Sequence, residues 1–280
     1  MLYHRTMAKP LPSPAVQADT IAGQIDALTS TSPDFMTSLA RGLAVLRAFS
    51  DARGPQTIAQ LSHRTGIPRA AVRRCLHTLR ELGYVDAELN NYTLRPKVLS
   101  LGYAYLASTP LAASARPLLE QISATLHEST SLAVLEEDEV VYVARAATTR
   151  VMSVALGAGS RLPAYCTSLG RVMLTQLPAT DLDAYLARVT LAARTPNTIV
   201  SQKKLRAVLA QVRADGYAIN DEELELGLRS IAVPVRDASG KVLAALNCGA
   251  QAARVSVAQL ERDFLPVLLR GAQELAVLLP

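Results

Sequence analysis

The stretch "TIAQLSHRTGIPRAAVRRCLHTLRELGYV", residues 57–85, decides the fold of the first part of this chain. Thr57 followed three residues later by Gln60 is a capping-box pattern, in which the hydroxyl and the amide satisfy free backbone N–H groups at a helix start. Gly66 is suited to end that helix, and Pro68 suits the first turn of the next one. Two helices joined by a short turn that contains glycine predict a helix-turn-helix.

The second of these helices has two different faces at 3.6 residues per turn. One face is apolar and is formed by Val72, Cys75, Leu76, Leu79 and Leu82. The other face carries Arg69, Arg73, His77 and Arg80, with Arg74 beside it. A solvated surface or an ion-pair network is one explanation for this charge, but Glu81 is the one acidic residue in the stretch. An anionic partner outside the chain is the better explanation.

The excess positive charge of the chain lies in one segment. The 280 residues carry a formal net charge of +5. Residues 37–97 hold ten Lys or Arg and four Asp or Glu, whereas residues 98–280 hold seventeen of each kind and residues 1–36 hold two against three. This asymmetry is typical of a nucleic-acid-binding module attached to an electrically neutral one.

Further signals surround the helix-turn-helix. A preceding amphipathic helix is indicated by Leu39, Leu43, Leu46 and Phe49 at helical spacing. After Gly83, the segments 84–85 and 92–94 are expected to form two short strands around an Asn90-Asn91 turn. We therefore predict a winged helix-turn-helix over residues 36–95. Residues 1–35 are rich in Pro, Ser, Thr and Ala, and we expect a disordered extension there.

We expect this domain to bind double-stranded operator DNA. Arginine is the commonest reader of guanine in the major groove, because its two donors match the guanine edge. Arg69 and Arg73 lie nearest the helix start and are the candidates for base contacts. Phosphates are expected to be bound by Arg74, Arg80 and the wing-side Arg95 or Lys97. The complete set of expected DNA contacts is Thr57, Arg69, Arg73, Arg74, His77, Arg80, Arg95 and Lys97.

The remaining chain indicates a linker helix over residues 96–110 and a mixed α+β domain over residues 111–280. Its expected elements are a helix near 111–127, a hairpin over 130–146, a strand near 151–155, helices near 167–177, 180–188 and 201–215, two strands over 229–237 and 241–249, and a final helix from Ser256 that Pro266 should kink. The fold class is therefore mixed α and β, with an all-α winged helix-turn-helix followed by an α+β domain.

Catalytic, metal and membrane signals are weak. Cys75, Cys166 and Cys248 lie far apart without a C-x-x-C pair, which argues against zinc and disulfides and favours a reducing, cytoplasmic setting. Phosphate-binding loops and nucleophile elbows do not occur. Cys166 stands at a helix start, where the dipole could lower its pKa. No apolar run reaches the roughly 18 residues that span a bilayer, and a signal peptide is not indicated. We expect neither an enzyme nor a cofactor.

Two polar stretches of the second half suggest a binding site. The segment "YCTSLGR", residues 165–171, places hydroxyl and backbone N–H groups at a helix start, which suits a small carboxylate, although simple N-capping by Thr167 or Ser168 explains it equally well. The segment "INDEELELGLRSIAVPV", residues 219–235, crowds acidic and amide groups before a glycine and a strand. A solvated turn is the alternative for this segment.

Several motifs in order resemble the IclR family of bacterial transcriptional regulators. They are "SLARGLAVLRAF" (38–49), "TGIPRAAVRRCLHTLRELGYV" (65–85), "TSLGRVML" (167–174) and "GLRSIAVPVRDASGKVLAALN" (227–247). The likeness covers about residues 34–280. The segments "HESTSLAVLEEDEVVYVARA" (127–146) and "RLPAYCTSLGRVML" (161–174) are most similar to the subgroup that controls aromatic-acid breakdown through the β-ketoadipate pathway.

The resemblance implies a GAF-like effector domain, dimers that often pair into tetramers, and RNA polymerase as a further partner if the protein activates transcription. It also implies that a small organic acid, such as protocatechuate, 4-hydroxybenzoate or β-ketoadipate, binds beneath the helix start. The implied walls are Thr167, Ser168, Leu169, Gly170, Asn220, Asp221, Leu228, Ser230, Asn247 and Gly249. Family members can carry an acid, a cysteine and serines at Asn220, Ser230, Asn247 and Gly249, so the effector cannot be copied across. Arg145 or Arg150 could supply a counter-charge.

The sequence therefore predicts a regulator that binds operator DNA and senses a small organic acid. One alternative is a DNA-binding protein whose C-terminal domain only dimerises. A third and weaker hypothesis is an enzyme with a vestigial DNA-binding segment.

Overall fold

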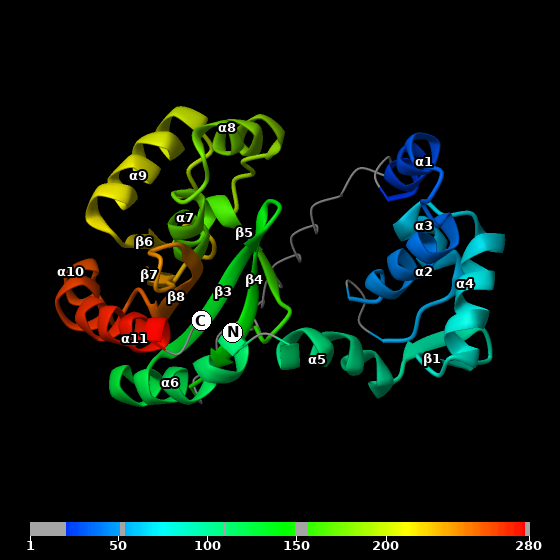
Figure 1. The fold of residues 1–280 in the computed structure, drawn as a ribbon, viewed down its shortest axis with the longest axis horizontal. Coiled ribbons are helices and arrows are strands. Elements are labelled where there is room, and N and C mark those ends of the chain that lie inside the picture. Colours follow the sequence, from blue (N-terminus) through cyan, green and yellow to red (C-terminus); the bar gives the residue numbers. More distant parts are fainter. Residues whose placement is uncertain (1–20, 51–53, 109, 149–155, 278–280) are drawn as a thin grey trace, which may run out of the picture. The chain divides into compact units, whose positions relative to one another are not determined.

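The computed structural model describes residues 21–50, 54–108, 110–148 and 156–277 (Figure 1). The chain divides into two compact units, one ending at Leu101 and the other beginning at Gly102. The elements of the first unit are α1 (Ile21–Thr31), α2 (Thr37–Arg47), α3 (Ile58–Thr65), α4 (Arg69–Glu81), β1 (Val85–Glu88), β2 (Asn91–Leu94) and the short η1 (Pro96–Val98). Helix α5 (Leu99–Ser108) crosses the boundary between the units.

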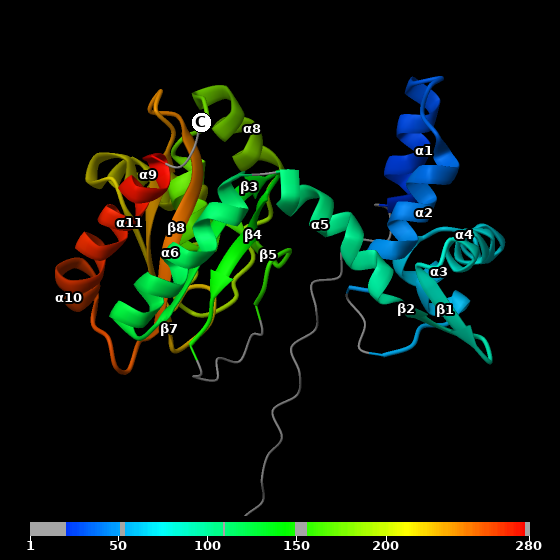
Figure 2. The ribbon, with the colours of Figure 1, turned by 60° about the horizontal axis from the view of Figure 1, so that its bottom comes forward.

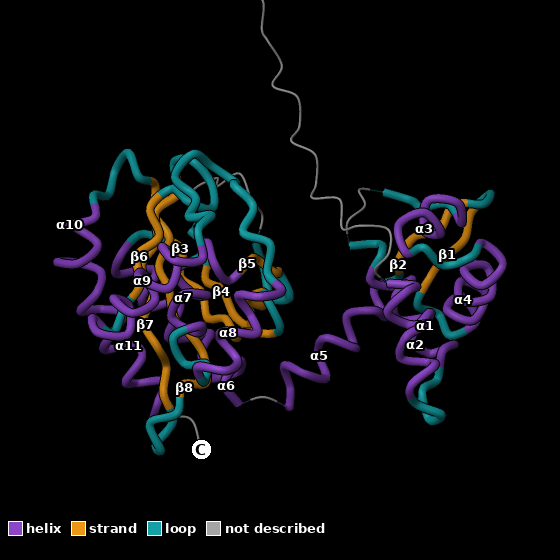
Figure 3. Tube along the Cα trace, turned by 90° about the horizontal axis from the view of Figure 1, so that it is seen from above, coloured by secondary structure: helices purple, strands orange, loops and turns teal. Residues whose placement is uncertain are grey.

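The first unit has the predicted helix-turn-helix. The capping box forms, because the Gln60 backbone N–H donates to the Thr57 hydroxyl and the Thr57 N–H donates to Gln60 Oε1. Gly66 ends α3 in the left-handed conformation, at φ 71°. On the predicted apolar face of α4, Val72, Leu76 and Leu79 are buried against α2 and α3 and Cys75 is half-buried. Leu82 was expected on the same face but is 52% exposed, because α4 ends at this residue. Figure 3 shows α2, α3 and α4 grouped in this unit, and their buried apolar side chains form one core.

Helix α1 corrects the expectation of a disordered extension. Residues 1–20 lie outside the described residues, but Ile21–Thr31 are helical. Ile25 is buried in the core that α2 and α4 share. The Asp26 carboxylate accepts a hydrogen bond of 3.5 Å from Arg41 on α2. This helix was missed because a single buried isoleucine in an alanine- and threonine-rich segment gives little periodicity.

The wing differs from the prediction by one residue. Glu88 pairs with Asn91, so the turn is Leu89-Asn90 rather than Asn90-Asn91. Both turn residues have positive φ, 48° and 76°, as the tight two-residue turn between antiparallel strands requires. The Leu89 side chain is 91% exposed at the tip. Gln56 adds an unpredicted bridge to Tyr92, with two backbone hydrogen bonds of 2.8 Å.

The second unit is built on an antiparallel sheet of six described strands. The strands are β3 (Ser129–Glu136), β4 (Glu139–Ala146), β5 (Arg161–Pro163), β6 (Ala218–Asp221), β7 (Leu228–Arg236) and β8 (Val242–Gln251). Their order across the sheet is β5-β4-β3-β8-β7-β6. The predicted hairpin and the last two strands are confirmed, whereas the short edge strands β5 and β6 were not predicted. The strand expected near 151–155 lies outside the described residues.

Helices cover both faces of this sheet (Figure 2). One face packs on α6 (Pro110–Leu126) and α11 (Leu265–Val277). The other face packs on η2 (Ala164–Cys166), α7 (Ser168–Leu174), α8 (Ala179–Arg188) and α9 (Gln202–Asp215). Each face has its own apolar core, so every central strand is buried on both sides.

The final helix is interrupted where proline was expected to kink it. After α10 (Val257–Gln259), residues Leu260–Phe264 form a π-helical turn that leads directly into α11. Pro266 stands in the first turn of α11, where it lacks the N–H group of a regular helix. No helix among the described residues is long and apolar enough to cross a membrane.

Candidate functional site

The basic residues of α4 form one exposed face. Arg69, Arg73 and Arg74 are exposed and make no ion pair with any described residue. Arg80 is also exposed, but its guanidinium donates to Glu81 at 3.0 Å and lies 3.4 Å from the His77 ring nitrogen Nδ1. Three unpaired cations on a helix whose other face is buried are suited to contact an anionic polymer.

Two of the expected DNA contacts have structural tasks in the unit. The hydroxyl of Thr57 accepts the capping hydrogen bond at the start of α3, and the residue is half-buried. The Lys97 ammonium donates a hydrogen bond of 2.8 Å to the carbonyl oxygen of Leu82, at the end of α4, and lies 5.2 Å from the centroid of the Tyr84 ring. Arg95 is exposed and has no side-chain partner among the described residues.

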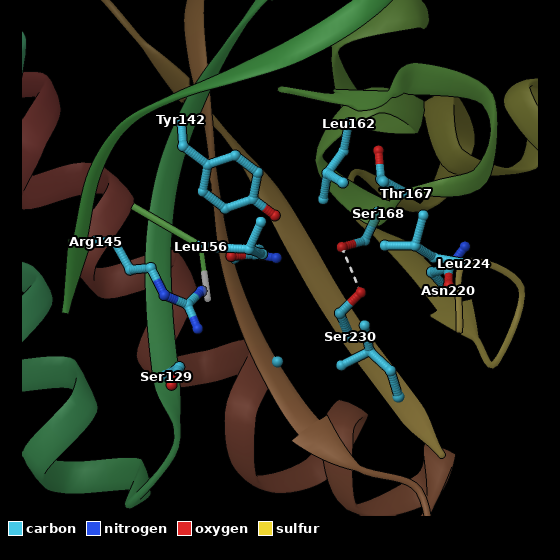
Figure 4. A pocket seen from close by; sticks show the side chains of 13 residues that line it. Ser129, Tyr142, Arg145, Leu156, Leu162, Thr167, Ser168, Asn220, Leu224 and Ser230 are labelled. Atoms are coloured by element: carbon cyan, nitrogen blue, oxygen red, sulfur yellow. Dashed lines mark hydrogen bonds between the residues drawn. The ribbon is translucent and has the colours of Figure 1, made fainter. Parts of the chain in front are cut away.

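A pocket opens on the sheet face that carries η2 and α7. The pocket has a volume of about 460 Å³, part of which is open to solvent. The lining side chains are Ser129, Tyr142, Arg145, Leu156, Leu162, Thr167, Ser168, Asn220, Leu224, Leu228, Ser230, Asn247 and Gly249. Figure 4 shows Tyr142 and Arg145 on one side of the opening, and Ser168 and Ser230 on the other.

Strand register explains why polar residues meet on this face. Successive residues of a strand point to opposite faces, so paired residues of neighbouring strands share a face. Ser131 pairs with both Arg145 and Asn247, which gives one polar row across β4, β3 and β8. A second row crosses β3, β8, β7 and β6, where the paired residues are Ser129, Gly249, Ser230 and Asn220.

The wall opposite the β4 residues is held by hydrogen bonds around α7. The Ser168 and Ser230 hydroxyl groups are 2.8 Å apart, and the Asn220 amide donates to the Cys166 carbonyl oxygen at 2.9 Å. Thr167 caps α7, because its hydroxyl accepts from the Gly170 N–H at 3.1 Å. The simple capping role is therefore the one that the structure shows for Thr167.

Two polar groups of the pocket lack partners. The Arg145 guanidinium donates to the Ser131 hydroxyl at 3.0 Å, but its Nε is buried without a hydrogen-bond partner. No carboxylate among the described residues forms an ion pair with Arg145, and burial lowers the pKa of its guanidinium. The Asn247 side chain is 8% exposed, and its Oδ1 is buried without a partner. Burial raises the pKa of Tyr142 to about 12, so this phenol is neutral near pH 7.

The structure brings most of the expected effector residues to this pocket. Thr167, Ser168, Asn220, Leu228, Ser230, Asn247 and Gly249 all line it. Leu169 instead lies fully buried in the core, and Gly170 lies against the backbone of Ala164. Residues Ser129, Tyr142, Leu156, Leu162 and Leu224 line the pocket but were not predicted. The hairpin register of β3 and β4 was the signal that could have placed Tyr142 and Arg145. Arg150 lies outside the described residues.

The expectation that Asp221 lines the effector site is wrong. It was expected beside Asn220 in the same site, but both residues belong to strand β6 and so point to opposite faces. The Asp221 carboxylate accepts a hydrogen bond of 2.7 Å from Arg229, its cross-strand partner. Asp221 therefore does not line the pocket.

A buried ion pair holds the loop beside the pocket. The Arg171 guanidinium donates to Glu223 at 2.6 Å, and the two side chains are 2% and 10% exposed. Arg171 also donates to the carbonyl oxygen of Tyr165 at 3.1 Å. The Glu223 carboxylate accepts from the Ile199 N–H at 3.1 Å. Because Leu224 lines the pocket, this pair joins a pocket wall to helix α7.

The Cys166 thiol, just before the start of α7, is not activated for nucleophilic attack. Burial raises the pKa of the Cys166 thiol to about 11, which outweighs the effect expected from a helix start. The thiol is therefore protonated at pH 7 and a poor nucleophile. Within the described residues, no group of His, Cys, Asp and Glu side chains could hold a metal ion.

Comparison with known proteins matches both units to one family. Residues 38–88 match the IclR helix-turn-helix domain, and residues 103–277 match the family described as bacterial transcriptional regulator IclR C-terminal. The Pca regulon regulatory protein of Pseudomonas putida is 56% identical over 91% of this chain and 87% of its own length. The p-hydroxybenzoate hydroxylase transcriptional activator of Acinetobacter baylyi is 39% identical over 86% of this chain and 91% of its own length.

A solved structure of another IclR homolog is also similar to this chain. It is an IclR homolog from Microbacterium hydrocarbonoxydans complexed with 4-hydroxybenzoate. It is 26% identical to this chain, covers 86% of it and 98% of its own length, and has a TM-score of 0.74. The two relatives are a regulatory protein and a transcriptional activator. With both domains matched in order, the chain belongs to the IclR family of bacterial transcriptional regulators.

Proposed function

We propose that this regulator binds operator DNA through α4 and the wing, and that its pocket binds a small organic acid of aromatic-acid breakdown. The candidate effectors are protocatechuate, 4-hydroxybenzoate and β-ketoadipate. The likeness to the Pca and p-hydroxybenzoate regulators supports this pathway. The main structural support for an acidic effector is Arg145. It is a cation in the pocket that has no carboxylate partner among the described residues.

The DNA contacts divide by position on α4. Arg69 and Arg73 are near the N-terminus of the helix, where helix-turn-helix proteins contact base edges. In this proposal Arg74, His77, Arg80 and Arg95 contact phosphates. The side chains of Thr57 and Lys97 also fix the start of α3 and the end of α4.

The DNA-bound form is proposed to be a homodimer, which can pair into a tetramer. Apolar side chains remain exposed on α5, where Leu99 is 75% and Tyr103 is 70% exposed. Leu101 and Tyr105 extend this surface. A helix with apolar residues around its whole circumference needs a partner to cover it. A second copy is the suited partner, because paired recognition helices read two half-sites of an operator.

Effector and DNA binding are proposed to be coupled by population shift. Effector binding favours one spacing of the two recognition helices in the dimer, and α5 links the two units of each chain. The coupling is reciprocal and is typically about 1–3 kcal/mol. RNA polymerase is the further partner if the protein activates transcription. These events take place in the cytoplasm, where operator DNA is found.

Thermal unfolding of the purified full chain tests this function. Protocatechuate, 4-hydroxybenzoate and β-ketoadipate are added separately, with pyruvate as a small non-aromatic control. A ligand that binds only the folded state raises the melting temperature. A rise with one of the three acids, together with a change in operator affinity, supports the proposal. No rise with any acid favours a protein whose C-terminal domain only dimerises.

A further inference from the structure

We propose that the pocket recognises its effector at two points, with Arg145 binding a carboxylate and the Asn247 amide binding a second oxygen group at the other end of the molecule. This inference rests on the proposed function and assigns the orientation of the acid in the same pocket. Its basis is the pair of buried polar atoms that have no partner, Arg145 Nε and Asn247 Oδ1.

The first point is a positioned cation. Arg145 lines the pocket, and Ser131 fixes one end of its guanidinium by accepting a hydrogen bond of 3.0 Å. Ser131 itself is fully buried, so this contact is shielded from water. The remaining donors of the guanidinium form no hydrogen bond with the described residues, and two of them can bind a carboxylate side by side. Charged hydrogen bonds of this kind are the stronger class.

The second point is an amide without partners. Asn247 is 8% exposed, and its side chain forms no hydrogen bond with the described residues. A buried acceptor that stays unpaired is unfavourable, so the site is completed when a ligand group binds there. An amide both donates and accepts, which suits a hydroxyl group and also allows the carbonyl or carboxylate oxygen of a keto acid.

The two points come from different strands of the sheet. Arg145 and Asn247 flank Ser131 in one row of the sheet, on β4 and β8. Neighbouring strands are about 4.8 Å apart, so the two backbones are separated by about 10 Å. The Ser168 and Ser230 hydroxyl groups are 2.8 Å apart, so one of their two O–H donors is used within this pair. Leu162 and Leu224 supply apolar surface in the same pocket.

Calorimetric titration of the full chain tests this arrangement with 4-hydroxybenzoate, benzoate and β-ketoadipate. Arg145→Met should weaken every acid by about 10- to 100-fold, because each loses its charged contact. Arg145→Lys keeps the charge and should weaken binding less. Arg116→Met is the matched control, since Arg116 is exposed on α6 and pairs only with Glu120 among the described residues.

Asn247 variants identify the second group. Asn247→Leu should weaken 4-hydroxybenzoate or β-ketoadipate by about tenfold and leave benzoate, which has no second oxygen group, unchanged. Asn247→Asp keeps an acceptor but adds a negative charge. It should retain binding of a hydroxyl-bearing acid and abolish binding of a dicarboxylate. Melting curves of each variant without ligand confirm that it folds.

The outcomes separate this inference from the proposed function. If the unaltered protein binds none of the acids, the proposed function itself fails. If it binds one of them and Arg145→Met or Asn247→Leu binds that acid with unchanged affinity, the effector-binding function stands and the two-point arrangement is overturned.

Discussion

The Lys97 ammonium ties the end of α4 to the segment that leads into α5. It donates to the Leu82 carbonyl oxygen at 2.8 Å, and Leu82 is the residue at which α4 ends. Carbonyl groups at a helix C-terminus carry partial negative charge, so a cation is favourable there. The aliphatic part of the Lys97 side chain also passes close to Gly83. A Cβ atom added at Gly83 would lie 3.7 Å from Lys97 Cδ. Lys97 was expected to bind phosphate, and these contacts show that its side chain also has a structural role.

We therefore expect Lys97→Met to lower the stability of the DNA-binding unit by up to about 1 kcal/mol. The salt dependence of operator binding should stay close to that of the unaltered protein, since no phosphate contact is lost. Thermal unfolding and binding titrations at several salt concentrations measure the two effects. Arg95→Met is the control, because Arg95 is exposed without a side-chain partner among the described residues. A reduced salt slope with unchanged stability would restore the phosphate role of Lys97.

Arg73 and Arg80 should differ in their effect on DNA binding. Arg73 is unpaired among the described residues and lies near the start of α4. Arg73→Ala should therefore weaken the free energy of binding to operator DNA by about 1–3 kcal/mol. It should weaken binding to unrelated DNA much less. Arg80→Ala should weaken both kinds of binding and reduce the salt slope by about one. Titrations with operator and unrelated DNA distinguish them. Equal losses in the two variants would contradict this division.

The buried pair Arg171–Glu223 should be important for stability. Glu223→Gln leaves the Arg171 charge uncompensated, and breaking a buried pair costs about 3–5 kcal/mol. The matched control is Asp183→Asn, which breaks an equally short but exposed pair with Arg206, at 2.6 Å. That change should cost less than about 1 kcal/mol. Urea unfolding measures the loss of unfolding free energy in each variant. Similar losses in the two variants would mean that the buried pair contributes no more to stability than the exposed pair.

Two helical glycines should respond oppositely to alanine. A Cβ atom at Gly170 would lie 2.2 Å from the Ala164 carbonyl oxygen, so Gly170→Ala must push α7 away from η2 and destabilise the unit. A Cβ atom at Gly42 on α2 would meet no atom within 4 Å, and alanine there should stabilise by roughly 0.5–1 kcal/mol. Melting temperatures of the two variants should move in opposite directions. A stable Gly170→Ala protein would show that the close approach to Ala164 is unimportant.

Local sequence signals placed the DNA-binding unit well. The Thr57 capping box and Gly66 act within one turn of chain, so their conformations follow from the residues themselves. The long strands of the second unit were also recognisable from their β-branched residues. Helix α1 was not, because its stability comes from burying Ile25 in a core that distant residues form.

The pocket could be predicted only in part, for a related reason. Its walls come from strands whose register is set by pairing across the sheet, and the short strand β6 has no clear pattern of its own. Without that strand, Asn220 and Asp221 could not be assigned to opposite faces. Arg145 was a candidate counter-charge, but only its pairing with Ser131 places it in the pocket.

The alternation along β8 has a consequence for how this protein can change over evolution. Leu246, Cys248 and Ala250 face the core under α6 and α11, whereas Asn247 and Gly249 face the pocket. Residues that maintain the fold and residues that choose a ligand are therefore interleaved but spatially separated by the sheet. Substitutions at the second set can produce descendants that respond to new compounds while the first set, and with it the fold, is inherited unchanged.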